Sequence, residues 1–414
     1  MGTDDILGVK SRRSVATTLV ALLLWLALAA GVIGFVLAQH HHLQGSNVAS
    51  AGSSIPFNHV YPPDPVPFER PAVGASSPYV SPLNRVHSGM NYTSIVALAS
   101  ALQPGTLFQT AHGHWLLSRP VQLGADTSLA LVGPLHLDLV PGSFLLAEHH
   151  ATVSLTNVTV EGVSKTKLAD ISTSDHRGFI DARSGATLRL TNDHFSYLGY
   201  LGDQTYGLTM DGASSRSAVV KCSMNADYFG VYIGKLRGIL FTGNRITNSV
   251  IYGIDPHTHD SNLVITHNVV INSGVHGIVV ADFVTRSQIE YNVVTGSHDH
   301  GIVIYQFSND NIVEHNAVSH SFDGIVVSNS SNNTIKFNSV QYVHRFAIRL
   351  DGQSSSNQVS QNRLRGAIVG IYVYRGASFN RIVNNTFQGM YENIRVRSDA
   401  PSNVVWPNPG RSEL

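Results

Sequence analysis

The chain has 414 residues, long enough for one large domain or two ordinary ones, and its 27 basic and 27 acidic residues give a formal net charge of zero. This balance excludes a global field that would steer a polyanion, so we expect no nucleic-acid partner and only local patches for charged polymers. Only 13% of residues are charged and 36 are glycine, which favours extended sheet over a helical bundle. Cys222 is the single cysteine, which excludes an internal disulfide bond and a cysteine-based metal site.

The N-terminus carries a targeting signal. Residues 15–38 form an uncharged run, preceded by Lys10, Arg12 and Arg13, that is long enough to span a bilayer. It is either a retained anchor or a cleaved signal, since small or apolar residues at 36–38 would suit a peptidase. We predict a signal-anchor or signal peptide, a transmembrane or signal helix, over residues 1–40. The protein is then exported: anchored to the cell membrane with its domain outside the cytoplasm, or secreted or periplasmic.

Residues 41–90 are rich in proline and serine, which predicts an extended stalk. The next segment, 91–105, contains TSIVALASAL and is expected to form a short helix that caps the following domain. That domain is predicted over residues 106–400, and 401–414 are interpreted as a C-terminal tail.

Two residue series recur along the C-terminal half at a period near 23. An asparagine returns every 22 to 24 residues, flanked by aliphatic side chains, at Asn244, Asn268, Asn292, Asn316, Asn338, Asn362 and Asn385. A turn residue followed by an aliphatic one returns at Gly230, Gly253, Gly277, Gly301, Gly324, Ala347, Gly370 and Asn393. The repeat predicts an all-β, single-stranded right-handed parallel β-helix, in which the asparagines form an internal ladder. A leucine-rich repeat would need leucines at fixed positions, and a propeller would need a period of about 40.

One coil departs from the pattern. Along a strand, alternate side chains point inward and outward, so Ile254 and Pro256 are expected inside, whereas Asp255 and His257 are expected on the outer face. Neighbouring coils have mostly apolar residues in these outward positions. Since a solenoid has no structural need for a carboxylate and an imidazole there, we expect function at this coil.

Further polar and aromatic residues are expected on the same surface. A groove along the axis, with aromatic rings for sugars and cations for carboxylates, would suit a linear acidic polysaccharide. The candidate substrate-binding residues are Tyr232, Lys235, His276, Asp282, His300, Tyr305 and Arg349.

Other interpretations of these residues stay open. His257, His276 and His300 would suit a metal site, but neighbouring outward columns do not by themselves converge tetrahedrally, so we predict none. Asp255 would also serve as a cap of the turn at Pro256, and Lys235 as a solvated surface lysine.

The segment YGIDPH at 252–257 resembles the hallmark of the mannuronan C5-epimerases, which is Tyr-Gly-apolar-Asp-Pro-His followed by an acid. Thr258 replaces that acid here, and the next acid is Asp260. Other similar segments are WLLSRPVQL (115–123), FSYLGY (195–200), TYGLTM (205–210), YFGVYIGK (228–235) and HGIVVADFV (276–284). The resemblance therefore covers roughly residues 106–400.

The resemblance implies an isomerase that abstracts the C5 proton of a mannuronate residue in the polymer and reprotonates C5 from the opposite face. It implies His257 as the base, Tyr252 as the acid, and Asp255 as a positioner of His257 or a hydroxyl contact. The periplasmic branch has an arginine where this chain has Asp282, so we expect Lys235 to neutralise the substrate carboxylate, with Arg286 and Arg349 behind it. Calcium dependence is left open, and no other cofactor is expected.

Two alternatives remain from the sequence. A polysaccharide lyase shares the first proton abstraction but then expels the 4-linked sugar. A non-catalytic carbohydrate-binding β-helix would need no such coil. The expected partners are a linear acidic polysaccharide, such as polymannuronate or alginate, and the membrane through the N-terminal helix, and we expect a monomer.

Overall fold

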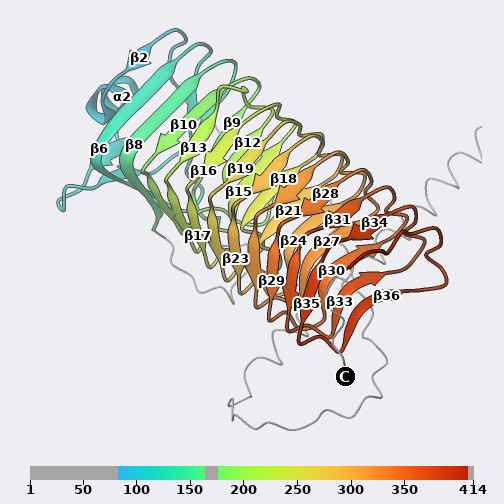
Figure 1. Cartoon of the computed structure of the whole chain (residues 1–414). Helices are drawn as coiled ribbons and strands as arrows, with labels where there is room; N and C mark the ends of the chain where they lie inside the picture. The colour runs from blue at the N-terminus through green and yellow to red at the C-terminus, as the bar shows by residue number, and fades with distance from the viewer. Residues whose placement is uncertain (1–82, 164–175, 409–414) are drawn as a thin grey trace, which may run out of the picture. The chain divides into compact units, whose positions relative to one another are not determined.

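The computed structural model describes residues 83–163 and 176–408. In this part of the chain short parallel strands stack coil upon coil, from β2 and α2 at one end to β36 at the other (Figure 1). The predicted all-β parallel β-helix is confirmed. No helix among these residues has the length and apolar character needed to cross a membrane, and the anchor predicted at 15–38 lies outside them.

The longest sheet runs along one face of the stack and carries the candidate site. Its members pair in parallel, each with the strand one coil away. In order they are β1 (Asn84–Arg85), β5 (Val121–Leu123), β7 (Phe144–Ala147), β9 (Phe179–Arg183), β12 (Gly207–Asp211), β15 (Phe229–Gly234), β18 (Ile254–His257), β21 (Ile278–Ala281), β24 (His300–Tyr305), β27 (Asp323–Ser328), β30 (Phe346–Asp351), β33 (Val369–Val373) and β36 (Glu392–Val396).

Two further columns of short strands complete each coil. One contains β10 (Thr187–Thr191), β13 (Ala218–Val220), β16 (Leu240–Thr242), β19 (Val264–Thr266), β22 (Gln288–Glu290), β25 (Ile312–Glu314), β28 (Thr334–Lys336), β31 (Gln358–Ser360) and β34 (Arg381–Val383). The other contains β11 (His194–Ser196), β14 (Ser223–Asn225), β17 (Arg245–Thr247), β20 (Val269–Ile271), β23 (Val293–Thr295), β26 (Ala317–Ser319), β29 (Ser339–Gln341), β32 (Arg363–Arg365) and β35 (Thr386–Gln388).

The N-terminal end is built differently. Two long strands, β6 (Ser128–Leu139) and β8 (Thr152–Gly162), replace the paired short strands, and β8 pairs with both β10 and β11. The helix α2 (Ile95–Ala101) lies at this end (Figure 1). In the chain it follows β2 (Asn91–Tyr92) and precedes the antiparallel pair β3 (Leu107–Gln109) and β4 (Trp115–Leu117). The Ser94 side chain caps it by accepting from the Ala97 N–H, and Ile95 and Leu98 are buried.

The stack extends beyond the predicted limits of 106 and 400. Asn84 of β1 pairs with Val121, and Asn91 of β2 pairs with Ser128, within the segments interpreted as stalk and cap. In the segment interpreted as a tail, Val404 bridges to Arg381. These pairings involve one or two residues each, too few to leave a periodic signal in the sequence.

One continuous hydrophobic core runs inside the stack from Val86 to Ala400, and smaller clusters are separate from it. It consists of aliphatic columns, one residue per coil, such as Ile254, Ile278 and Ile302, which are all fully buried and in register. This is the inward side of the alternation that the sequence predicts.

The asparagine ladder predicted from the repeat is confirmed. From Asn244 to Asn385 each side-chain N–H donates to the side-chain oxygen of the next asparagine, at 2.9 to 3.1 Å, and the ladder ends at Asn408. A second ladder, missed in the sequence, runs through Asn311, Asn333, Asn357, Asn380 and Asn403.

We expect the ladder to contribute strongly to stability. Asn316 accepts from the N–H and side chain of Asn292 and donates to the Ile289 carbonyl, all in the buried interior. Asn316→Ala leaves these groups without partners, and should lower the free energy of unfolding by roughly 2–4 kcal/mol. Chemical denaturation measures this. Gln288→Ala, at an exposed amide side chain on the extended strand β22, should change it by less than about 0.5 kcal/mol, and equal losses would contradict the structural role.

Candidate active site

The site lies on the outer face of the longest sheet, around β18. Register places Tyr232 beside Asp255, and Gly234 and Ala281 on either side of His257. The two flanking residues have no side chain or only a methyl group, which leaves room for the imidazole and for the ring of Tyr232. A Cβ atom on Gly234 would come within about 3.0 Å of that ring and its hydroxyl.

His257 is held at the end of β18 with 16% of its side chain exposed. Its Nδ1 shares a 2.6 Å hydrogen bond with the Thr258 hydroxyl and lies 3.8 Å from a carboxylate oxygen of Asp282. The ring lies against Tyr232, with centroids 6.0 Å apart. The imidazole is thus oriented, and still reachable from solvent.

Asp260 fixes the backbone of this turn. One of its carboxyl oxygens accepts the N–H of His257 at 3.0 Å and the other accepts the N–H of Leu236 at 2.7 Å. The side chain is fully buried, and burial raises its pKa well above the ordinary value. Asp260 therefore connects two coils and sets the position from which His257 projects.

Asp255 and Tyr252 lie on the predicted coil but deeper than expected. Asp255 is on the outer face, yet only 1% exposed, and Tyr252 is 4% exposed. Burial raises the pKa of Tyr252 well above its ordinary value, and the charge of Asp255 adds to this effect. The phenol therefore keeps its proton at neutral pH, as a proton donor must.

Tyr252 is part of a row of neighbouring aromatic rings that links the coils. Its ring lies 5.0 Å from that of Phe229 and 5.3 Å from that of His276, which in turn lies 4.9 Å from His300. Burial, and then the neighbouring His300, lower the pKa of His276 to about 3. Burial and the nearby Arg349 lower the pKa of His300 well below its ordinary value. Both imidazoles are neutral near pH 7 and cannot supply a positive charge for a uronate.

The lowered pKa of His276 predicts a contribution to acid sensitivity. A pKa that falls from 6.5 to about 3 on folding stabilises the fold above about pH 6.5, and this contribution is lost as the pH drops toward 3. His276→Phe keeps an aromatic ring in the stack but cannot titrate. Between pH 6.5 and pH 4 the wild type should therefore lose more unfolding free energy than the variant.

Denaturant titrations of both proteins at several pH values test this difference. Asp227 has the opposite effect, because burial raises its pKa to about 8 and its contribution to the free energy of unfolding declines as the pH rises. This effect is the same in both proteins and cancels in the comparison. Parallel stability curves for the two proteins would contradict the assignment.

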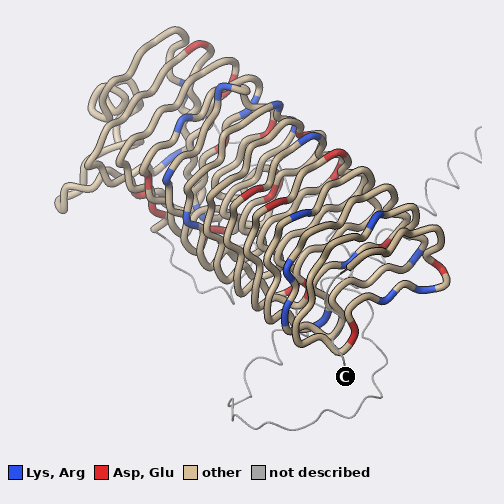
Figure 2. Tube along the Cα trace, in the orientation of Figure 1, with Lys and Arg blue, Asp and Glu red and all other residues tan. Residues whose placement is uncertain are grey.

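Two of the predicted cations, Lys235 and Arg286, are exposed, and Lys235 lies beside the candidate site. Its ammonium pairs at 3.0 Å with the buried carboxylate of Asp211, and 54% of the side chain is exposed. It follows Gly234, the residue in register with His257, so it lies at the edge of the same surface. Basic and acidic residues are interspersed along the coils in Figure 2, so recognition of a carboxylate falls to individual cations such as this one.

The structure corrects the expectation for Arg349. Its side chain is 7% exposed, and its guanidinium is paired with Asp323 at 2.8 Å and Asp351 at 3.0 Å. Arg345 binds the same Asp323 carboxylate. These buried pairs already neutralise the guanidinium, so Arg349 is an internal structural cation.

The other predicted contacts lie around the rim. Asp282 follows β21 with a third of its side chain exposed, and Tyr305 ends β24 in a partly exposed position. Tyr232 is only 3% exposed. Among the described residues, the histidine and carboxylate atoms close enough to hold one metal ion lie not at His257, His276 and His300 but at His114, His136 and Asp138.

Asp211 and the role of Asp260 were not predicted from the sequence. Asp211 stands in register with Gly234, and hence in the column of His257, one coil before the clear repeat begins. Extending the column by one period would have identified it. Asp260 gave no such signal, because only the folded turn brings its carboxyl group to the His257 N–H.

Comparison with known proteins adds two sequence matches of partial length. The family model described as right handed beta helix region matches residues 144–318 and supports the handedness of the coil. The model described as periplasmic copper-binding protein (NosD) matches residues 258–413.

Among curated proteins, the mannuronan C5-epimerase of Pseudomonas aeruginosa is 27% identical over 189 residues, which is 42% of this chain. That of Pseudomonas fluorescens is 24% identical over 193 residues, again 42% of the chain. The matched region spans about a third of these relatives, 35% and 36% of their length.

Among solved structures, the periplasmic alginate epimerase AlgG superposes with a TM-score of 0.69 at 19% identity, covering 77% of this chain and 83% of that one. This likeness is one of fold. The chain is thus similar in sequence to mannuronan C5-epimerases and has the right-handed parallel β-helix fold.

Proposed function

We propose that this protein is a mannuronan C5-epimerase, an isomerase that converts β-D-mannuronate to α-L-guluronate within a polyuronate. The observation that carries the proposal is the His257 imidazole, fixed by Asp260 and Thr258, partly exposed, with a protonated phenol on the same coil. The sequence match to curated epimerases supports it.

The chemistry requires three groups. An imidazole is suited to take the C5 proton because its ordinary pKa is near neutrality, and Nε2 is the nitrogen that can act while Nδ1 keeps its bond to Thr258. The carboxylate next to C5 must be neutralised as negative charge develops, and Lys235 is the cation proposed for this. Tyr252 then delivers a proton to the opposite face of C5.

The same proposal covers the substrate contacts, the oligomeric state and the location of the protein. Asp255 would position His257 or bind a sugar hydroxyl, while Asp282, His276, His300, Tyr232 and Tyr305 would line or support the subsites. We propose a monomer that acts on a linear acidic polysaccharide outside the cytoplasm. Residues 1–40 would direct its export, and the protein would then stay anchored by them or be released. The relative of the same fold is described as periplasmic. No cofactor is proposed for catalysis except for an open dependence on calcium, which the assay tests with and without a calcium chelator.

A product assay tests the proposal. Polymannuronate incubated with the protein should acquire the proton NMR signals of guluronate at constant chain length. A rise in ultraviolet absorbance from unsaturated chain ends would instead identify a lyase. If neither change occurs on any polyuronate tried, the protein is a non-catalytic carbohydrate-binding β-helix.

A further inference from the structure

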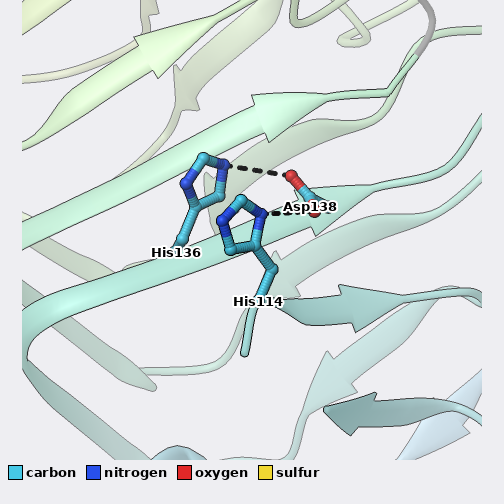
Figure 3. Close-up of side chains that lie close together, drawn as sticks. All are labelled: His114, His136 and Asp138. Atoms are coloured by element: carbon cyan, nitrogen blue, oxygen red, sulfur yellow. Dashed lines mark hydrogen bonds and ion pairs between the residues drawn. The ribbon is translucent and has the colours of Figure 1, made fainter. Parts of the chain in front are cut away.

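A cluster of four ionisable side chains lies at the N-terminal end of the β-helix, outside the candidate active site. Figure 3 shows three of them, His114, His136 and Asp138, with both rings facing the carboxylate. They come from successive coils, since Leu116 of β4 pairs with Asp138 of β6, which pairs with Glu161 of β8. His136 and Asp138 are two residues apart on one strand and so share its outer face.

The polar atoms of this cluster are close together. Nδ1 of His114 lies 3.2 Å from Oδ2 of Asp138, and Nε2 of His136 lies 3.1 Å from Oδ1. The same Nε2 lies 3.3 Å from a carboxylate oxygen of Glu161. The two rings are stacked with centroids 3.8 Å apart.

His136 has a buried nitrogen that lacks a hydrogen bond. Its Nε2 is buried, and although two carboxylate oxygens lie within 3.3 Å, neither forms a hydrogen bond with it of acceptable geometry. A buried polar atom without a hydrogen bond is costly, and the carboxylate oxygens within 3.3 Å of this nitrogen make its position favourable for a cation. One cation there would give the nitrogen a partner.

We propose that His114, His136 and Asp138, whose ligand atoms all lie within 4.8 Å of one another, bind a divalent transition-metal ion together with Glu161, which approaches His136, and that Zn²⁺ is the best match. Two imidazoles and two carboxylates form a tetrahedral zinc set, with metal–ligand bonds of about 2.0–2.2 Å. Adjacent ligand atoms in such a tetrahedron lie about 3.3 Å apart. The distances from the His114 and His136 nitrogens to the two oxygens of Asp138, 3.2 and 3.1 Å, are close to this spacing. Calcium prefers sites made of oxygen alone.

Metal binding needs a modest change in the two rings. Because they are stacked with an angle of 11° between their planes, their lone pairs run nearly parallel. Rotation about the Cβ–Cγ bonds, which are soft torsions, turns both nitrogens toward one ion. His114 is 43% exposed and His136 is 27% exposed, so a metal ion reaches the cluster from solvent.

The ion would join three coils. The ligands come from the loop before β4 and from β6 and β8, where the antiparallel pair β3–β4 closes this end of the stack. Since a ligand that binds only the folded state stabilises it, Zn²⁺ should raise the melting temperature. The cluster lies outside residues 258–413, the part matched by the copper-binding family model.

Zinc titration of the full-length, metal-stripped protein tests the site. The chain has 21 histidines, so the readout is the difference between wild type and variants. His136→Gln and Asp138→Asn should each weaken binding of one Zn²⁺ equivalent by about 100-fold or more and abolish its thermal shift. His194→Gln is the matched control, an exposed histidine on β11 in register with Thr159, beside the cluster. It should bind Zn²⁺ as the wild type does.

The outcomes are decisive in both directions. Loss of one equivalent in the two cluster variants alone supports the site, as does a tetrahedral Co²⁺ absorption spectrum that disappears with them. If either variant fails to fold, as judged by circular dichroism, His114→Gln replaces it, because His114 is the most exposed ligand. Equal Zn²⁺ binding by wild type and cluster variants, no binding at all, or displacement of Zn²⁺ by Ca²⁺ would overturn the proposal. None of these results bears on the proposed epimerase activity.

Discussion

His257→Gln should reduce epimerisation of polymannuronate by about 10²–10⁴-fold, the range that a general base contributes. Glutamine keeps a polar side chain within reach of Thr258 but cannot take a proton. The imidazole lies at the surface end of β18 and its backbone is held by Asp260, so the fold should lose no more than about 1 kcal/mol. Initial rates by proton NMR and the melting temperature give the two readouts.

His267→Gln is the control for loss of a histidine as such. His267 is exposed and stacks on Tyr291, away from the candidate site. It should have wild-type activity. An active His257→Gln enzyme, or one that is inactive because it unfolds, would remove His257 from the proposed chemistry.

Tyr252→Phe should separate proton removal from inversion. The phenylalanine ring keeps the stack on Phe229 and His276 but lacks the phenol proton. Guluronate formation should fall by about 10²–10⁴-fold. His257 would still remove the C5 proton and return one to the same face, so the mannuronate that remains should still exchange C5 hydrogen with solvent.

Nuclear magnetic resonance in D₂O distinguishes these two processes. Tyr291→Phe, at an exposed tyrosine of another stack, is the matched control and should behave as the wild type. If Tyr252→Phe abolishes exchange together with inversion, Tyr252 is needed before proton removal. If it changes neither, the proton donor is another group.

The repeating features of the fold could be predicted from sequence because each has a physical period. The ladder from Asn244 to Asn385 and the buried column of Ile254, Ile278 and Ile302 follow from stacking equivalent residues one strand spacing apart. Strand alternation also placed Asp255 and His257 on the same outer face.

Features that depend on neighbouring coils could not be predicted in this way. Strand alternation predicts whether a side chain points outward, but not how far neighbouring side chains bury it. The burial of Asp255 could therefore not be predicted. Arg349 was predicted to bind the substrate, but two carboxylates neutralise it in the folded chain, and one of them comes from another coil. The cluster at His114 and His136 lies among the long strands β6 and β8, where the 23-residue period is weak.

Deuterium incorporation at C5 is the most direct test of the central claim, that His257 removes a proton from a uronate held on this face. Polymannuronate incubated with the wild-type protein in D₂O should yield guluronate labelled at C5, with no unsaturated ends, and the His257→Gln protein should yield no label. Guluronate formed without label, or equal labelling by both proteins, would contradict it.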